Sequence, residues 1–321
     1  MTDCLIIGGG LAGLLAAKRL QIQNLTVKVV DKGLGIGGRL ASRRITPPEL
    51  GKGTFDYGAP FFRGQSRAFK QLLSDWEQTC AIAKWPIEPE TYRGIPSNRS
   101  LAQFLAQDCD VHNQTRVTRF TAQAQGGWRV ETEDGRLFSA QALVLTPPVP
   151  QTLELVQNSN IELESTQLSA LTDVQYEPCI TVLALLAIPN ALPESGWLSF
   201  EDHPCLKHLV CNQKKGVSPD AIAVTIYARA DFSQAHLKDD LNEVANTLLI
   251  AAEPYLRSQI VDFQVHRWRY AQTHKPCPYP YLEIPAPATL IIGGDGFGDP
   301  AISSLARAAL SGLAIAERLT G

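Results

Sequence analysis

The chain has 321 residues, of which 45% are hydrophobic and 19% are charged, and its formal net charge at pH 7 is -3. This composition excludes the disordered and collagen-like classes, and the weak net charge gives no general attraction to nucleic acid or to an anionic membrane. Since single hydrophobic cores stop growing near about 250–300 residues, we expect two lobes.

The cysteines and the N-terminal stretch favour a reducing compartment. The seven cysteines are odd in number and contain no C-x-x-C pair, so we expect neither a disulfide framework nor a metal site. The apolar stretch at residues 4–17 has no basic segment before it and is shorter than the roughly 20 residues that span a bilayer. We therefore expect a cytoplasmic protein without a membrane span or a nucleic-acid partner.

The first 31 residues have the pattern of a β-α-β unit. A buried-strand pattern at residues 4–8 precedes a helical pattern at residues 11–20, and a second β-branched strand follows at residues 26–30. A crossover helix between two strands predicts that the strands pair in parallel.

Three glycines form G-x-G-x-x-G between that first strand and the helix. Gly8 permits the turn, Gly10 lets a diphosphate approach the backbone, and Gly13 lets the helix pack closely on the strand. Asp31 follows about 20 residues later, where its carboxylate accepts ribose hydroxyls, while the N–H groups of the helix start face the phosphates. The predicted dinucleotide contacts are Gly8, Gly10, Leu11, Ala12, Gly13, Asp31 and Lys32.

The rest of the chain alternates between loops, strands and helices. A glycine-rich basic loop at residues 32–44, an extended segment at 54–62, a helix at 66–80 and an irregular connection at 85–96 are expected first. Strands are then expected at residues 117–120, 127–133, 137–145, 180–188, 197–200, 208–211, 221–228, 261–270 and 289–292, and helices at 237–255 and 301–319.

The glycine pattern alone does not separate NAD from FAD, and later motifs carry that distinction. The sequence GGR at residues 37–39, FDYGA at 55–59, HRWRYAQ at 266–272 and GGDGF at 293–297 resemble the glutathione-reductase-type flavoproteins, and most closely the renalase-like branch of the FAD-dependent amine oxidases. The resemblance implies an α/β fold: a Rossmann-like FAD-binding domain of the p-hydroxybenzoate hydroxylase-like type, with an inserted antiparallel-sheet α+β substrate domain. The implied division is 1–63, 101–150 and 271–321 for the FAD-binding domain, and 64–100 and 151–270 for the substrate domain.

The same resemblance implies further contacts to FAD. Arg39 would bind the phosphates, the amide of Val117 would contact the adenine, and Asp295 would bind the ribityl chain. No cysteine lies within residues 293–297, so we expect FAD to be held without a covalent bond. The implied contacts are Gly38, Arg39, Gly58, Ala59, Val117, Gly294, Asp295, Ser304 and Leu305.

The sequence LIIGG occurs twice, at residues 5–9 and 290–294. We interpret the two copies as neighbouring strands of one cofactor sheet, with the substrate domain inserted between them in the chain. Their glycine turns are then expected on opposite sides of one extended FAD.

The resemblance also implies an NAD(P)/FAD-dependent oxidoreductase. We expect a flat reduced substrate, a dihydronicotinamide isomer, to pass a hydride to flavin N5. The protein would then bind a nicotinamide dinucleotide, and molecular oxygen would be the final electron acceptor. One alternative is a flavin amine oxidase for a small amine, although no lysine near N5 is assignable. Another is a non-catalytic protein like the Rab GDP-dissociation inhibitors. The candidate pocket residues are Tyr57, Phe62, Trp268 and Tyr270.

Overall fold

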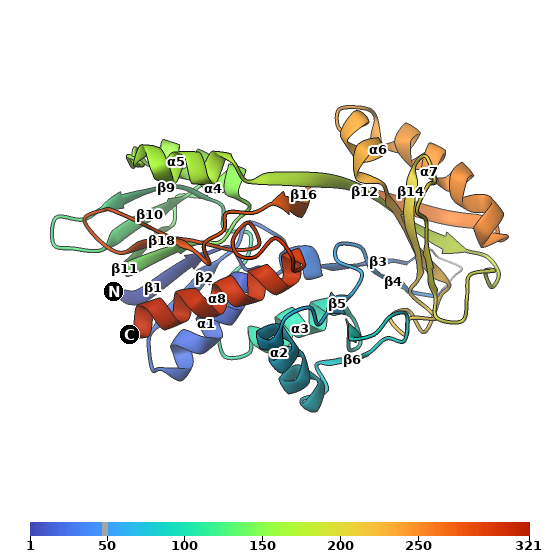
Figure 1. Ribbon diagram of the computed structural model, residues 1–321, viewed down its shortest axis with the longest axis horizontal. Coiled ribbons are helices and arrows are strands. Elements are labelled where there is room, and N and C mark those ends of the chain that lie inside the picture. The colour runs from blue at the N-terminus through green and yellow to red at the C-terminus, as the bar shows by residue number, and fades with distance from the viewer. Residues whose placement is uncertain (47–50) are drawn as a thin grey trace.

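One lobe of the molecule, the α/β lobe, is built on an eight-stranded sheet (Figure 1). The computed structural model describes residues 1–46 and 51–321. The main path of the sheet runs in the order β17 (Leu282–Ile284), β18 (Leu290–Ile292), β11 (Leu137–Leu145), β1 (Thr2–Ile7), β2 (Val27–Val30), β8 (Asp110–His112). β9 (Val117–Ala122) and β10 (Trp128–Thr132) continue from β11 as an antiparallel meander.

The predicted β-α-β unit is confirmed, because β1 and β2 pair in parallel around a crossover helix. The expectation that the two LIIGG strands are neighbours is wrong. β11 lies between β1 and β18 and pairs in parallel with both. The last four residues of β11 are apolar and buried, as they must be in a strand that has a neighbour on each side and helices above and below it.

Helices cover both faces of this sheet. On one face α1 (Leu11–Ile22) and α8 (Ser304–Thr320) lie side by side, and α2 (Arg67–Gln78) and α3 (Asn98–Leu105) pack against them. α1 and α8 approach closely at Gly312, where an added Cβ would lie 2.4 Å from the carbonyl oxygen of Ala12. On the other face α4 (Val149–Asn158) and α5 (Ser165–Thr172) pack with β9 and β10.

Four helices of the described residues were not predicted from the sequence: α3, α4, α5 and α6 (Ala230–Ala235). The start of α4 shows why one was missed. β11 ends at Leu145, just before Pro147 and Pro148, and Pro148 is also the N-cap of α4, with Pro150 in its first turn. The first turn of a helix does not use the N–H that proline lacks, so the same residues that end a strand also start a helix.

The second lobe, the β-sheet lobe, is a five-stranded antiparallel sheet. Its α6 (Ala230–Ala235) and its long helix α7 (Leu241–Leu256) cover one face. β12 (Gln175–Leu186) and β16 (Ile260–Lys275) are long enough to run from this lobe toward the α/β lobe (Figure 1). The strand order is β13 (Trp197–Ser199), β14 (Leu206–Cys211), β15 (Ala223–Ala228), β12 (Gln175–Leu186), β16 (Ile260–Lys275).

The helix expected at residues 237–255 begins later, at Leu241. The Asp240 side chain caps it by accepting the N–H groups of Asn242 and Glu243, at 2.8 Å and 3.2 Å. An aspartate at this position satisfies the first free donors of a helix and so fixes where it starts.

Two small sheets and a short 3-10 helix, η1 (Gly38–Leu40), connect the lobes. One sheet pairs β3 (Ser42–Ile45) with β4 (Gly53–Asp56), and the other joins β5 (Phe62–Arg63), β7 (Thr91–Gly94) and β6 (Ile82–Lys84). β3 falls in the stretch expected to be a loop, and β7 falls in the stretch expected to be irregular.

The domain division drawn from the sequence stays a proposal. Two segments assigned to the substrate domain pack on the α/β lobe: α2, and the chain from α4 to α5. Within the described part of the chain, no helix is long and apolar enough to cross a membrane.

Candidate functional site

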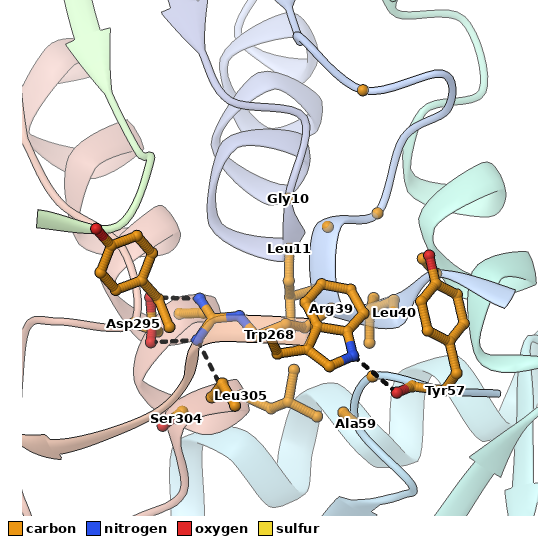
Figure 2. Close-up of a pocket in the computed structure, with 18 of the residues that line it drawn as sticks. Gly10, Leu11, Arg39, Leu40, Tyr57, Ala59, Trp268, Asp295, Ser304 and Leu305 are labelled. Atoms are coloured by element: carbon orange, nitrogen blue, oxygen red, sulfur yellow. Dashed lines mark hydrogen bonds and ion pairs between the residues drawn. The ribbon is translucent and has the colours of Figure 1, made fainter. Parts of the chain in front are cut away.

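A cavity of about 1930 Å³ runs between the two lobes. One end is lined by the glycine loops that follow β1 and β2, and we call it the phosphate end. The other end is lined by residues of β3, β14 and β16, and we call it the substrate end. Figure 2 shows the middle of this cavity, where Arg39, Asp295, Trp268 and Tyr57 meet.

The three fingerprint glycines have three different surroundings. Gly8 has a φ of 109°, which disfavours a side chain, and a Cβ on Gly13 would lie 2.0 Å from the carbonyl oxygen of Gly8. A Cβ on Gly10 would meet no atom within 4 Å. Gly10 is also the N-cap of α1 and supplies no side-chain cap, so the first N–H groups of the helix remain available to an anion.

Asp31 holds the phosphate end together. Its two carboxylate oxygens accept the N–H of Gly9 at 2.6 Å and the N–H of Gly33 at 2.7 Å. Each carboxylate oxygen can accept a second hydrogen bond, so ribose hydroxyls remain possible donors. The neighbouring Lys32 lines the cavity and donates to Oε1 of Gln151 at 2.8 Å.

Arg39 and Asp295 form a bidentate ion pair, which the sequence did not predict. Nη1 and Nη2 of Arg39 donate to the two carboxylate oxygens at 2.6 Å and 2.5 Å (Figure 2). The hydroxyl of Thr273 also donates to Asp295, and the guanidinium of Arg307 donates to its backbone oxygen at 3.0 Å. Burial disfavours the charged form of Arg39, but the Asp295 carboxylate outweighs it and raises the pKa of Arg39. Both residues line the cavity.

The N-terminus of α8 reaches the same region. Ser303 caps the helix by accepting the N–H of Ala306 at 3.2 Å. Ser304 and Leu305, in the first turn, line the cavity, and Oγ of Ser304 accepts the N–H of Thr273 at 3.0 Å. A helix start here places a partial positive charge beside the cavity.

The substrate end has an aromatic wall, which we define as Tyr57, His266 and Trp268. The ring centroids of Tyr57 and Trp268 are 5.1 Å apart, and those of His266 and Trp268 are 4.5 Å apart. The indole N–H of Trp268 donates to the backbone oxygen of Tyr57 at 2.9 Å (Figure 2). Arg43 lies 4.9 Å from the Tyr57 ring centroid. Burial, and then the charge of Arg43, lower the pKa of His266 to about 4, so its imidazole is neutral at pH 7.

A buried ion pair supports this wall from behind. Nζ of Lys215 donates to Asp56 at 2.7 Å and to the backbone oxygen of Pro60 at 2.6 Å, and the side chains of the pair are 0% and 1% exposed. The other carboxylate oxygen of Asp56 accepts the hydroxyl of Ser42 at 2.7 Å and the backbone N–H of Asn98 at 3.0 Å. These bonds fix both ends of the cavity-lining segment that follows β4.

The structure brings most of the residues predicted from the sequence to one cavity. Phe62 is an exception: it is fully buried among α2, α3 and neighbouring elements and does not line the cavity. The adjacent Phe61 does line it, because neighbouring residues of an extended segment face opposite sides. Ala12, Gly13 and Gly294 also lie behind the cavity surface. The predicted residues that line it are Gly8, Gly10, Leu11, Asp31, Lys32, Gly38, Arg39, Tyr57, Gly58, Ala59, Val117, Trp268, Tyr270, Asp295, Ser304 and Leu305.

Several lining residues were missed, and their signals were weak. Arg43 stood within the basic run that was interpreted as a loop. Lys207, His208 and Tyr227 come from β14 and β15, where only the strand pattern was visible. Their side chains reach the cavity because the sheet face opposite α7 is turned toward it. The residues were missed because a single sequence does not show which strands pair.

Comparison with known proteins agrees with this geometry. Residues 6–76 match the family model described as NAD(P)-binding Rossmann-like domain. Solved structures with the same fold include cyclohexylamine oxidase from Brevibacterium oxydans, with a TM-score of 0.69, 14% identity and 99% of each chain covered. A putrescine oxidase variant with redesigned cofactor binding has a TM-score of 0.66 at 12% identity, covering 99% of this chain and 98% of that one.

The fold, the cavity and the similarity to known proteins together indicate an FAD-dependent oxidoreductase, with an α/β lobe and an antiparallel-sheet lobe. Among individual proteins, the chain is similar to renalase of Mus musculus over its full length, with 24% identity over 347 aligned positions and 99% of both chains covered. It also matches part of a flavin-containing monooxygenase of Arabidopsis thaliana, at 28% identity over 42% of this chain and 31% of that protein. The renalase-like resemblance and the fold class are therefore confirmed, and these relatives support FAD as the cofactor.

Proposed function

We propose that the protein oxidises a flat, reduced substrate at the substrate end of the cavity, and that this substrate is a dihydronicotinamide isomer. FAD supplies the hydride acceptor at N5, so the chain itself needs to bind and orient the donor and exclude water. Molecular oxygen as the final electron acceptor belongs to the same proposal and is supported by the resemblance to renalase-like enzymes.

The aromatic wall is the observation that carries this proposal. Tyr57 and Trp268 pack against each other with their planes tilted by 35°, and together they offer an aromatic surface on which a flat heterocycle can stack. Hydride transfer from a dihydropyridine ring needs no general base. The neutral His266 is therefore suited to shaping the wall, and no residue has to remove a proton.

Electrostatics separates this proposal from the amine oxidase alternative. Positive charges outnumber negative charges around the substrate end, and such a surface attracts anionic donors and repels ammonium groups. The cations are Arg43, Arg44, Lys52, Lys207, Arg267 and Arg269, and the carboxylates are Glu177 and Asp220. A nicotinamide dinucleotide carries phosphates, so it matches this charge.

A flavin amine oxidase remains the second candidate, because two solved structures with this fold are named as oxidases of cyclohexylamine and putrescine. A non-catalytic binding protein is a third candidate. The surroundings of Gly10 argue against a non-catalytic protein without flavin. The start of α1 has no side-chain cap, and a Cβ on Gly10 would meet no atom within 4 Å, which leaves space for a bound diphosphate.

We also propose the residues that hold FAD. The uncapped start of α1 and Asp31 would bind the diphosphate and the ribose. Gly58, Ala59 and the first turn of α8 would lie along the flavin, and Val117 near the adenine. No cysteine occurs within residues 293–297, so we expect acid precipitation to release all of the flavin.

Anaerobic reduction of the flavin tests the substrate assignment. The purified holoenzyme is mixed with NADH, NADPH, their 2- and 6-dihydro isomers, and primary amines, and absorbance near the flavin maximum is followed. We expect a dihydro isomer to bleach the flavin fastest, and re-aeration to form one hydrogen peroxide for each substrate oxidised. Faster bleaching by an amine would replace this proposal with the amine oxidase assignment.

A further inference from the structure

Arg99 is a cation in the phosphate end that no motif assigned. It lies in the first turn of α3 and lines the cavity beside the loop after Asp31. Its Nε is buried and has no hydrogen-bond partner among the residues that the structure describes. Within residues 1–46 and 51–321, no carboxylate lies within ion-pair distance of its guanidinium. A buried N–H without a hydrogen-bond partner is unfavourable, since this donor has left water and gained no acceptor.

The loop opposite Arg99 is shaped to receive it. A Cβ on Gly35 would lie 2.6 Å from Nη2 of Arg99 and 3.2 Å from its Cζ. The backbone of Gly35 is outside the left-handed region, so its conformation does not require glycine. A side chain at residue 35 would therefore displace the guanidinium of Arg99 from this position.

The position of this loop indicates which part of a ligand Arg99 faces. At one end, the N–H of Gly33 is bound to the carboxylate of Asp31 at 2.7 Å. At the other end, the N–H of Gly37 donates to the backbone oxygen of Gly9 at 2.7 Å, and Gly37 bridges to Gly10 at the start of α1. Gly35 lies midway, between the ribose carboxylate and the helix start that faces the phosphates.

The first turn of α3 is held firmly enough to place a charge. The N–H of Asn98 donates to the buried Asp56 at 3.0 Å, and its side-chain amide donates to the backbone oxygen of Ala59 at 2.8 Å. Arg99 follows directly. Arg39, the arginine that the GGR motif assigned to the phosphates, has its terminal nitrogens bound to Asp295 instead.

We infer that Arg99 binds the diphosphate of FAD, and that Gly35 is glycine because this guanidinium needs its space. The inference rests on FAD as the cofactor and is independent of which substrate the enzyme oxidises. A planar guanidinium binds phosphate oxygens through two parallel hydrogen bonds. The arginine of the cradle thus comes from a helix about 60 residues beyond the glycine loop.

FAD affinity of the apoprotein tests the inference without measuring activity. FAD is removed, and rebinding is followed by quenching of its fluorescence for the wild type, Arg99→Met, Gly35→Ala and the double variant. Arg119→Met is the matched control, because Arg119 is exposed and does not line the cavity. Since a charge-assisted hydrogen bond is involved, we expect Arg99→Met to weaken FAD binding by about 10- to 100-fold. The Arg119→Met control should bind FAD as the wild type does.

The double variant and a second ligand make the result specific. Gly35→Ala should weaken FAD binding in the wild type. It should have little further effect in the Arg99→Met variant, because both changes remove the same contact, that of the guanidinium with FAD. ADP carries the diphosphate without the flavin, so Arg99→Met should weaken the binding of ADP by the same factor as the binding of FAD. If Arg99→Met is poorly folded by circular dichroism, Arg99→Lys and Gly35→Ala alone still measure the effect.

Three results have distinct meanings. A wild-type apoprotein that does not bind FAD would overturn the cofactor assignment itself. Normal FAD binding by the wild type together with unchanged binding by Arg99→Met would overturn the role of Arg99. Additive effects of Gly35→Ala and Arg99→Met, or an unchanged affinity for ADP, would show that Arg99 acts elsewhere than at the diphosphate.

Discussion

The two ends of the cavity are built in different ways. At the phosphate end, backbone groups do most of the binding: the uncapped start of α1 and the glycine loop held by Asp31 lie within the first 38 residues. At the substrate end, side chains from four separated segments meet, with Tyr57 and Trp268 more than 200 positions apart in the sequence. The first end therefore depends on glycines and local geometry, and the second depends on how the lobes pack.

The largest effects are expected at the fingerprint glycines. Gly13→Ala places a Cβ 2.0 Å from the carbonyl oxygen of Gly8, so we expect the α/β lobe not to fold. Gly10→Val places its side chain in open space and should change the free energy of unfolding by no more than about 1 kcal/mol. It should nevertheless abolish FAD binding, because the diphosphate must lie there. Urea unfolding and flavin content distinguish the two variants, and stoichiometric FAD in Gly10→Val would refute the assignment.

The next largest effect is expected at the ion pair behind the substrate end. Lys215→Met removes the partner of a fully buried carboxylate, which we expect to destabilise the protein by about 3–5 kcal/mol. Exchanging both partners, as Asp56→Asn with Lys215→Met, should recover part of this loss. Urea denaturation of the wild type and the two variants measures it, and a loss below about 1 kcal/mol in Lys215→Met would mean that the pair does not hold the segment.

A smaller effect on catalysis, without loss of the cofactor, is expected at the aromatic wall. Trp268→Leu should lower kcat/KM for the preferred donor by about 10-fold, since aromatic stacking contributes roughly 0.5–1.5 kcal/mol. Phe62→Leu is the matched control: it removes core packing and should reduce stability while kcat/KM stays unchanged. Equal effects of the two substitutions on kcat/KM would remove Trp268 from the substrate end.

The smallest effect at pH 7 is expected from two histidines of the substrate end, and it grows as the pH falls. Burial lowers the pKa of His208 to about 3, and burial with Arg43 lowers that of His266 to about 4. The unfolded chain binds protons on these histidines near pH 6.5 while the folded chain does not, so stability should fall as the pH drops from about 6.5 toward 4. His208→Asn should reduce this slope by about one proton, as measured by urea unfolding at several pH values. An unchanged slope would mean that His208 titrates normally.

The contrast between the phosphate end and the substrate end also explains which features could be predicted from the sequence. The β-α-β unit, the glycine cradle and most lining residues were predicted because each motif is local and has a physical reason for its spacing. The pairing of Arg39 with Asp295 was not predicted, since the two are 256 positions apart and each alone suggests a ligand contact. Arg99 carried no motif at all, and only the packing of α3 against the loop at Gly35 identifies it.

Strand order and side-chain direction were the other limits. The two LIIGG stretches predicted one shared sheet, but nothing in either stretch indicates that β11 lies between them. The choice between Phe61 and Phe62 depends on which side of an extended segment faces the cavity, and a one-residue change reverses it. The order of the strands and the direction of these side chains both depend on which strands pair over long distances in the chain, and a single sequence does not show this.

The flavin content of the purified wild-type protein tests the central claim, that the cavity between the lobes holds FAD. The absorbance spectrum is recorded before and after incubation with FAD and gel filtration, and the flavin is then released by acid and quantified. The account predicts a yellow protein with one FAD for each chain, all of it released by acid. A protein that stays colourless after incubation with FAD would contradict it.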